Sequence, residues 1–272
     1  MSTPLLSVIT PSYNQAEFIE DNLRSVRGLN GAIEHIVVDG DSDDETVSIL
    51  REYENEYNLR WVSEPDDGQS HAVNKGLEMA NGEYVGWLNA DDYYLSGANK
   101  LLNATKDQSD AIDVFYGDFV FVDIDGQELS KKYHANPSQF VHKYWQNYTA
   151  NHCSFIRRSV FKELGGLRED LEYVMDVELL WRILEEDYEQ RHVPHFIAAR
   201  RIHDDAKTVG ESTHKNEQEK ELLRDMYGYS LIDRFVPRKA LTLLAICLQT
   251  ILFASQSRWE AIENVVDTLK SR

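Results

Sequence analysis

Cysteine and basic side chains are both scarce in this sequence. Its 272 residues include two cysteines, Cys153 and Cys247, and neither lies in a metal-binding spacing. This excludes a disulfide framework and a cysteine-based zinc site, and it fits a reducing compartment. Lysine and arginine total 28 against 47 aspartate and glutamate residues, which gives a formal net charge of −19. So acidic a chain lacks the basic footprint of nucleic-acid binding, and a phosphate-bearing ligand would need a cation or a local basic cluster.

Long apolar runs are also missing. No run reaches the roughly 18 residues of a membrane-spanning helix, and the first residues lack a basic region and an apolar core, so we expect no signal peptide. The longest apolar stretch, Leu241–Ala254, predicts a helix that packs on the main domain, on a second copy of the chain or on a membrane surface. Flanking Arg238, Lys239 and Arg258 keep the membrane alternative open for the segment 238–258. We expect a cytoplasmic protein, with a peripheral position at the inner face of the membrane as the alternative.

Strand-like and helix-like segments alternate through the first 95 residues. Four short apolar runs predict strands, and stretches with apolar residues three or four positions apart predict helices between them. This alternation is typical of a mostly parallel sheet with helices on both faces. The predicted strands are Leu5–Thr10, Ile33–Val38, Leu59–Ser63 and Tyr84–Leu88.

Polar residues follow each of these strands, and the fourth strand ends in Asn89-Ala90-Asp91-Asp92. The carboxyl ends of parallel strands meet at one edge of a sheet, where open α/β folds bind their ligands. In an extended segment Asn89 and Asp91 point the same way, and Mg²⁺ takes one or two carboxylates together with substrate phosphates. The alternative for this segment is a polar turn before the next helix. Four polar strand ends at one edge favour a binding site.

The second half of the chain has a different pattern. Strand-like runs at 112–116 and 119–124 precede the hairpin turn Asp125-Gly126 and a third run at 128–133, which predicts an antiparallel extension of the sheet. A helix is expected over 137–145, followed by strands at 152–156 and 191–202 and a charged helix at 215–226.

One carboxylate lies on the apolar stripe of a predicted helix. Leucine or isoleucine occupies the positions three, four and seven residues after Asp176, so Asp176 shares their face near the start of the helix. The helix dipole favours an anion there, but a carboxylate on a buried face is costly without a partner or a function. Asp176 is therefore either a functional or a helix-capping residue. Glu178 and Arg182, four positions apart, are expected to pair.

Six segments, in this order, make the sequence similar to the family 2 glycosyltransferases, which are inverting enzymes with the GT-A nucleotide-sugar fold. The resemblance runs from about Ser7 to Thr208. It implies an α/β, Rossmann-like fold with a mixed, mostly parallel sheet flanked by helices. We expect a GT-A domain at 1–210, with a nucleotide-binding half at 1–95 and an acceptor half at 96–210, and a helical extension at 211–272. The six segments are 7–14, 36–43, 64–76, 87–92, 175–182 and 201–208.

The resemblance also implies roles for individual residues. Asp39 would accept a hydrogen bond from a uracil-type base, and Asp91 would bind a divalent metal, Mn²⁺ or Mg²⁺. Asp176 would be the general base. His203 would be a further metal ligand, with a structural histidine at a strand end as the alternative, and His152 is a weaker candidate on the acceptor side. The other residues expected to bind the nucleotide sugar are Pro11, Tyr13, Asn14, Asp67, Gln69, Asn74, Asn89 and Ala90.

Two residues depart from the family pattern. Asn89 replaces the first acid of the Asp-x-Asp motif, and Met175 replaces the acid that often precedes the base. We expect a metal-dependent inverting glycosyltransferase that moves a sugar from a nucleotide diphosphate sugar, with UDP as the expected nucleotide, to a glycan or lipid-linked acceptor in surface-polysaccharide assembly. The alternative is a catalytically silent nucleotide-sugar-binding or scaffold subunit. A nucleotidyltransferase is disfavoured because no Gly-rich basic loop follows the first strand.

Overall fold

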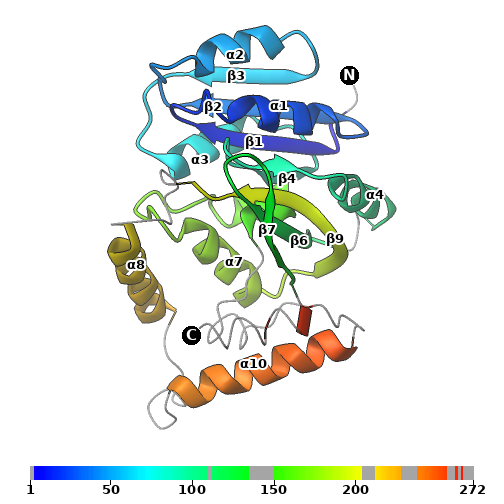
Figure 1. Ribbon diagram of the computed structural model, residues 1–272, viewed down its shortest axis with the longest axis vertical. Coiled ribbons are helices and arrows are strands. Elements are labelled where there is room, and N and C mark those ends of the chain that lie inside the picture. The colour runs from blue at the N-terminus through cyan, green and yellow to red at the C-terminus, as the bar shows by residue number, and fades with distance from the viewer. Residues whose placement is uncertain are drawn as a thin grey trace.

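The computed structural model describes residues 3–108, 112–134, 150–203, 212–227, 238–255, 261–262 and 265. In this part of the chain nine strands form one sheet, in the order β3-β2-β1-β4-β8-β6-β9-β5, and β7 pairs with β6 (Figure 1). The strands are β1 (Leu6–Ser12), β2 (Ile33–Asp39), β3 (Leu59–Ser63), β4 (Tyr84–Trp87), β5 (Tyr93–Tyr94), β6 (Val114–Val122), β7 (Glu128–Lys132), β8 (Ser154–Arg157) and β9 (Gln190–Arg201). The helices are α1 (Ile19–Arg27), α2 (Thr46–Tyr53), α3 (Gln69–Met79), α4 (Ala98–Gln108), α6 (Arg158–Glu163), α7 (Met175–Glu185), α8 (Ser212–Met226) and α10 (Arg238–Ser255), with a short 3-10 turn, η1 (Asn151–Cys153).

The first four strands form the parallel half of the sheet, as predicted. β1 lies between β2 and β4 and runs parallel to both, and β3 is parallel to β2. Alternate residues of β2 pack on opposite faces: Ile36 and Val38 contact the cluster formed with α3, α6 and α7, whereas Val37 packs with α1 and α2. β1 and β4 are buried along their whole length and β2 along most of it, so their apolar residues are not restricted to alternate positions. All four carboxyl ends consequently lie at one edge of the sheet.

The second half of the sheet is largely antiparallel, which confirms the predicted extension. β8 is antiparallel to β4 and to β6, and β7 is antiparallel to β6, while β9 runs parallel to β6. The hairpin turn predicted at Asp125-Gly126 is present. Gly126 has a φ of 80° and donates its backbone N–H to the Asp123 carbonyl at 3.0 Å, a left-handed conformation that glycine adopts without strain.

Two details of this half differ from the sequence-based expectation. The runs at 112–116 and 119–124 form the single strand β6, because Gly117 lets β9 approach closely: a Cβ at Gly117 would lie 2.3 Å from the Ile197 Cγ1. The strand expected to begin at His152 begins at Ser154 instead, since residues 151–153 form the turn η1. The helix expected over 137–145 lies outside the described residues.

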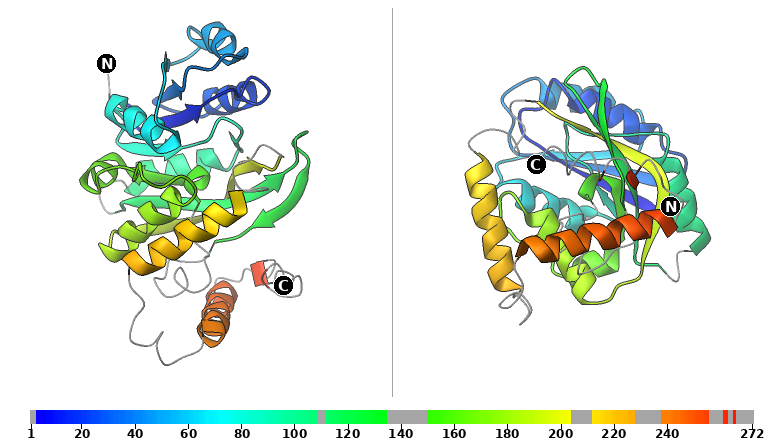
Figure 2. Two further views of the ribbon diagram at one scale, coloured as in Figure 1. Left: turned by 90° about the vertical axis from the view of Figure 1, so that its left-hand side faces the viewer. Right: turned by 60° about the horizontal axis from the view of Figure 1, so that its bottom comes forward.

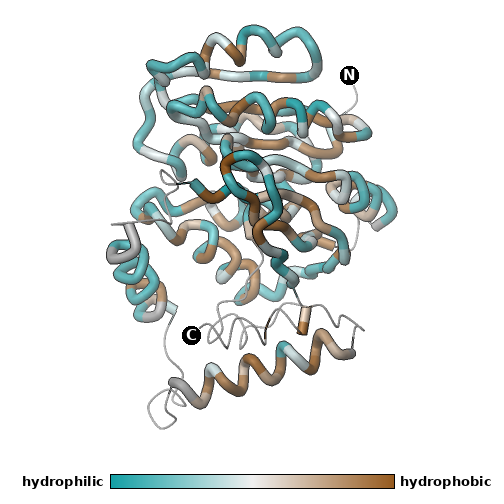
Figure 3. The backbone as a smooth tube through the Cα atoms, in the orientation of Figure 1, coloured by the Kyte–Doolittle hydropathy of each residue, from teal (hydrophilic) through white to brown (hydrophobic). Residues whose placement is uncertain are grey.

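The two C-terminal helices contact different parts of the molecule. Leu223 of α8 is buried in the same apolar cluster as α3, α6 and α7, so α8 shares the core of the preceding domain. Figure 2 shows α10 below the sheet and apart from it, and Figure 3 shows that α10 is far more apolar than α8. One face of α10 packs through Ile246 and Phe253 near Tyr133, whereas Leu243 and Ile251 are more than half exposed. Within the described residues, no helix is both long and apolar enough to cross a membrane.

Candidate active site at the carboxyl edge of the sheet

The segment that follows β4 is held from two sides. The Asn22 side chain, on α1, donates its Nδ2 hydrogens to the backbone carbonyls of Asn89 and Asp92 at 2.8 and 3.1 Å. From the other side, the backbone N–H of Arg201 at the end of β9 donates to the Asp92 Oδ1 at 3.0 Å, and the Arg201 guanidinium donates to the Asp91 carbonyl at 3.2 Å. Segment 89–92 is therefore held in a fixed conformation by α1 and β9, and is more than a turn before the next helix.

Asn89 uses its side-chain oxygen internally. The Oδ1 accepts hydrogen bonds from the Gln69 Nε2 at 2.8 Å and from the Trp87 Nε1 at 2.9 Å. These two bonds tie the first residue of α3 to the end of β4. An amide oxygen that already accepts two hydrogen bonds is poorly placed to bind a cation as well. Asn89 thus organises the site, and its predicted contact with the nucleotide sugar, like that of Gln69, stays a prediction.

Asp91 and His203 are brought together as the resemblance implied. The His203 Nε2 lies 3.1 Å from the Asp91 Oδ2, although 112 positions separate the two residues in sequence. A cluster of three or more His, Cys, Asp or Glu side chains suited to a metal is absent from the described residues. Mg²⁺ is often held by only one or two carboxylates, with substrate phosphates and water completing the shell. One carboxylate beside one imidazole, at the ligand-binding edge, fits such a partly built site.

Asp92 and His152 lie beneath this pair. Both are almost fully buried, and the His152 Nδ1 is 4.0 Å from the Asp92 Oδ2. Burial, followed by the charge of Asp91, raises the pKa of Asp92 well above its ordinary value, and burial lowers the pKa of His152. The His152 ring packs edge-on against Phe119 at 4.3 Å between centroids. His152 therefore supports the strand end from below, and its predicted acceptor role stays a prediction.

A shallow surface lies at the ends of β1 and β2. Tyr13 is 61% exposed, and a Cβ placed on Gly40 would meet the Asp66 Oδ2 at 2.9 Å and the Tyr13 Cδ2 at 3.5 Å. The exposed Tyr13 ring and the Asp66 carboxylate thus lie on either side of Gly40, which has no side chain. These are the features that a planar, hydrogen-bonding base needs for stacking and recognition.

Asp39 is buried under this surface. Its Oδ1 accepts from the Ser42 hydroxyl at 2.5 Å, and its Oδ2 accepts from the Ser42 backbone N–H at 3.0 Å and from the Ser63 hydroxyl at 2.7 Å. Ser42 in turn accepts from the backbone N–H of Asn14, whose φ is 51°. Asp39 therefore shapes the loop that carries Asn14. A direct contact between Asp39 and a uracil-type base stays a prediction.

The acid that faces the surface next to Gly40 is Asp66 rather than Asp67. The side chain of Asp67 is 93% exposed, and its Oδ2 lies 3.9 Å from the His71 Nδ1. Asp66 was not among the predicted site residues, because the sequence places two aspartates side by side and gives no sign of which one turns inward. The predicted nucleotide contact of Asp67 stays a prediction.

Three other predicted residues have clear structural surroundings. The Asn74 amide is fully engaged with the loop after α6: its Oδ1 accepts from the Leu167 N–H at 2.8 Å, and its Nδ2 donates to the Leu167 carbonyl at 2.9 Å. Ala90 is buried in the apolar cluster of α1 and α2, and Pro11 is buried within β1, opposite Val38. Direct contacts of these residues with a nucleotide sugar stay predictions.

Asp176 is the second residue of α7. It is half-buried, and its Oδ1 accepts the backbone N–H of Val177 at 2.8 Å. Burial raises the pKa of Asp176, while that hydrogen bond and the positive charges of Arg200 and Lys220 act in the opposite direction. A carboxylate with a raised pKa near the start of a helix is a suitable proton acceptor.

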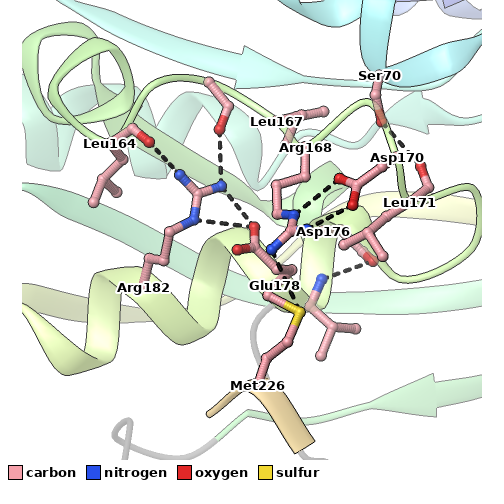
Figure 4. Close-up of polar contacts among 12 residues, drawn as sticks. Ser70, Leu164, Leu167, Arg168, Asp170, Leu171, Asp176, Glu178, Arg182 and Met226 are labelled. Atoms are coloured by element: carbon pink, nitrogen blue, oxygen red, sulfur yellow. Dashed lines mark hydrogen bonds and ion pairs between the residues drawn. The ribbon is translucent and has the colours of Figure 1, made fainter. Parts of the chain in front are cut away.

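The predicted pair of Glu178 and Arg182 is confirmed, and it anchors the same helix. The Arg182 Nη2 lies 2.7 Å from the Glu178 Oε2, and the guanidinium also donates to the carbonyls of Leu164 and Gly166 (Figure 4). The helix that carries Asp176 is consequently fixed to the loop at the end of α6.

Arg200 was not among the predicted site residues. Its positive charge acts to lower the pKa values of Asp176, Asp92 and His152. Arg200 on β9 thus contributes to the electrostatics of both the start of α7 and the end of β4, which are distant in sequence. Two adjacent arginines end this strand, and only the second, Arg201, belongs to a segment that resembled the family.

The family assignment follows from comparison with known proteins. A family model described as "Glycosyl transferase family 2" matches residues 7–165. The chain belongs to glycosyl transferase family 2. An uncharacterized glycosyltransferase of Mycobacterium tuberculosis strain H37Rv is 37% identical over 107 residues, which cover 39% of this chain and 40% of that protein. TuaG of Bacillus subtilis, which is named for teichuronic acid biosynthesis, is 39% identical over 141 residues, or 50% of this chain and 54% of TuaG. The matches thus span about half the length of these relatives.

Solved structures of other glycosyltransferases share the fold. A Staphylococcus aureus TarS fragment solved with UDP-GlcNAc superposes with a TM-score of 0.59 and 17% identity, covering 98% of this chain and 91% of that one. The mannosyltransferase PcManGT of Pyrobaculum calidifontis, solved with GDP-Man and Mn²⁺, gives a TM-score of 0.62 and 18% identity, covering 99% of this chain and 75% of that one. The predicted GT-A architecture, a mixed and mostly parallel sheet flanked by helices, is confirmed.

Proposed function

We propose that this protein is an inverting glycosyltransferase that moves a sugar from a nucleotide diphosphate sugar, with UDP as the nucleotide, to a hydroxyl of a glycan or lipid-linked acceptor. The observation that carries the proposal is the contact of Asp91 with His203 at the carboxyl edge of the sheet, with the raised-pKa carboxylate of Asp176 at the start of α7. The relative TuaG and the TarS complex with UDP-GlcNAc support the choice of a bacterial surface glycan and a UDP-linked donor.

In this proposal Asp176 removes the proton of the acceptor hydroxyl while that oxygen attacks the anomeric carbon. The attack takes place on the face opposite the departing diphosphate, so a single displacement inverts the configuration. The anomeric carbon gains oxocarbenium character as the bond to the diphosphate breaks. A base with a raised pKa holds the acceptor proton more firmly than an ordinary aspartate does, which helps the oxygen to attack.

Asp91 and His203 are the residues that would hold a divalent cation, Mn²⁺ or Mg²⁺. Such a cation acts as a Lewis acid that offsets negative charge on a departing diphosphate. The chain's net charge of −19 makes a positive centre at this edge necessary for a substrate with two phosphates. The fixed positive charge of Arg200 also acts on both Asp92 and Asp176.

In this proposal the two halves of the sheet bind different substrates. Residues 1–95 would bind the nucleotide, residues 96–210 would bind the acceptor, and residues 211–272 would form the helical extension. Docking of the segment 238–258 on a second copy of the chain or on the inner face of a membrane is consistent with the exposed Leu243 and Ile251 and stays a prediction.

A second function, a catalytically silent nucleotide-sugar-binding subunit, is favoured by one observation. Asn89 replaces a carboxylate of the Asp-x-Asp motif, and its oxygen is occupied by Gln69 and Trp87. If the single carboxylate of Asp91 holds the cation too weakly, the site binds a donor without turning it over.

Product release from UDP-, GDP- and dTDP-sugars, with and without Mn²⁺, separates these functions. The proposal expects metal-dependent release of the nucleoside diphosphate from one donor class. Donor binding detected as a thermal shift, without any release, would establish the silent binder. Release of inorganic diphosphate from a nucleoside triphosphate in the presence of a sugar 1-phosphate would instead identify a nucleotidyltransferase.

A further inference from the structure

A side chain from the C-terminal helix α8 binds the backbone just before the helix of the proposed base. The Glu219 Oε1 accepts the backbone N–H of Glu172 at 2.9 Å, and its Oε2 accepts the N–H groups of Tyr173 and Val174 at 2.7 and 3.2 Å. The three donors are consecutive, and the next two residues are Met175, which starts α7, and Asp176.

These bonds lie at the entrance to α7. Glu172 and Tyr173 precede the helix, and Val174 is its N-cap residue, which makes no side-chain capping bond, so Glu219 pairs three backbone N–H groups immediately before the helix. A carboxylate there is favoured by the helix dipole, and hydrogen bonds to an ionised acceptor are stronger than neutral ones. Glu219, 45 to 47 positions further along the chain, therefore organises the approach to α7, while within the first turn the Asp176 carboxylate accepts the Val177 N–H.

The helix that carries Glu219 is itself fixed to α7. Leu223 is buried in the core cluster that contains Leu179 and Leu180. The Tyr227 hydroxyl donates to the Glu178 carboxylate, and the Trp181 and Tyr227 rings meet edge-on at 5.8 Å. Figures 1 and 2 show α8 beside α7 in different views, and Figure 4 shows Met226, at the end of α8, in contact with Arg168. Glu219 is thus held in place independently of its own three bonds.

We propose that Glu219 is a positioning residue for the proposed base Asp176, so that one residue of helix α8 serves the catalytic site. This inference rests on the proposed function. The three bonds fix the backbone at 172–174. They therefore fix the position of the Asp176 side chain and its orientation toward the acceptor oxygen. A misplacement of about 1 Å at a reacting group costs up to about 100-fold in rate.

The test compares Glu219→Gln with Asp225→Asn, both in the full chain. Asp225 is an exposed residue of the same helix, so the control removes the same charge from α8 without touching α7. Glutamine at 219 keeps the length but offers one acceptor oxygen and a donor group to three N–H donors. We expect kcat for nucleoside diphosphate release to fall about 10- to 100-fold in E219Q, with an unchanged donor Kd, and to stay at the wild-type value in D225N.

Equal kcat values in E219Q and D225N, or a parallel loss of donor affinity and kcat in E219Q, would overturn the proposal, since a merely structural role affects the whole site. If E219Q does not fold by circular dichroism, Glu219→Asp gives the same comparison, because it keeps the charge and shortens the reach; the same two outcomes decide. Asp176→Asn measured alongside separates the two hypotheses. Wild-type turnover in D176N would reject the proposed base itself, whereas loss in D176N without loss in E219Q would reject only the role of Glu219.

Discussion

Two carboxylates of the molecule, the buried Glu34 and the half-buried Asp176, have opposite surroundings. Glu34, on β2 near the amino-terminal edge, is 3% exposed and accepts hydrogen bonds from the Ser7 hydroxyl, the Asn81 N–H and the Gly82 N–H at 2.5, 2.5 and 3.1 Å. Burial alone would raise its pKa, but the bonds from Ser7 and Asn81 outweigh burial and hold the pKa below its ordinary value. Glu34 is therefore ionised and fully used by the fold.

Asp176 at the carboxyl edge has the reverse balance. Its side chain accepts the Val177 N–H, and burial raises its pKa despite that bond and the charge of Arg200. The comparison teaches that burial alone does not identify a functional acid. A buried carboxylate with a full set of donors holds the structure together, whereas one with few donors retains affinity for a proton and can act on a ligand.

The largest effect is expected from Asp176→Asn. The amide keeps the shape of the side chain but cannot accept a proton, so kcat should fall about 10²- to 10⁴-fold, with the donor Kd and the melting temperature close to wild type. Steady-state release of nucleoside diphosphate and equilibrium donor binding measure the two quantities. A kcat within a factor of two of wild type would show that Asp176, like Glu34, has no role in turnover.

Asp91→Asn is expected to have the next largest effect. Loss of the carboxylate in contact with His203 should lower Mn²⁺-dependent turnover roughly 100-fold, the equivalent of a few kcal/mol. A Mn²⁺ titration of turnover is the measurement, and the variant should need far more metal than wild type. If the variant has the same metal dependence as wild type, the cation does not bind at Asp91. The functional site would then not lie at this edge of the sheet.

Glu34→Gln should change stability and leave chemistry alone. The glutamine amide has one acceptor oxygen, whereas the Glu34 carboxylate offers two oxygens to its hydrogen-bond donors. The free energy of unfolding should therefore fall by about 1–3 kcal/mol. Because the folded-state pKa of Glu34 is lowered, its stabilisation is present above the unfolded value near 4.5 and is lost as the pH falls through the folded-state pKa. Chemical denaturation at pH 7 and pH 3 should show a smaller wild-type advantage at pH 3 than at pH 7. A reduced kcat in the folded variant would contradict the structural assignment.

Tyr13→Ala should produce the smallest effect. The ring is exposed and contributes little to the core, so unfolding should be unchanged, while loss of stacking should weaken nucleoside diphosphate binding by about 1 kcal/mol, or roughly fivefold. Isothermal titration with UDP checks this. If the variant binds UDP with wild-type affinity, the uracil ring does not stack on the surface beside Gly40.

The sequence was sufficient to predict what depends on strand order and local pattern. Parallel strands place their carboxyl ends together, so the convergence of Asp39, Asn89 and Asp91 on one edge could be predicted. The pairing of Glu178 with Arg182 could be predicted from the helical repeat. The contact of His203 with Asp91 needed the resemblance as well, because the two residues are 112 positions apart.

Other features depend on how non-local side chains meet, which no local pattern encodes. Whether Asp66 or Asp67 faces Gly40 is decided by the turn before α3, and the two bonds that occupy the Asn89 oxygen depend on Gln69 and Trp87 packing together. Arg200 and Glu219 reach the site from β9 and α8, elements with no motif of their own at those positions. The charged composition of α8 gave no sign that one of its glutamates binds the backbone before α7.

The pH dependence of donor turnover tests the central claim, that Asp176 is an acid with a pKa raised by burial which acts as the base. Asp176 is active when ionised, so the rate is present above its pKa and is lost as the pH falls through that value. Because burial raises this pKa above the ordinary 3.8, the metal-saturated wild-type protein should lose kcat at a pH clearly above 3.8, within the range where it remains folded, and the residual rate of D176N should lack this limb. A wild-type kcat that stays constant down to pH 4, or the same acid limb in D176N, would contradict the account.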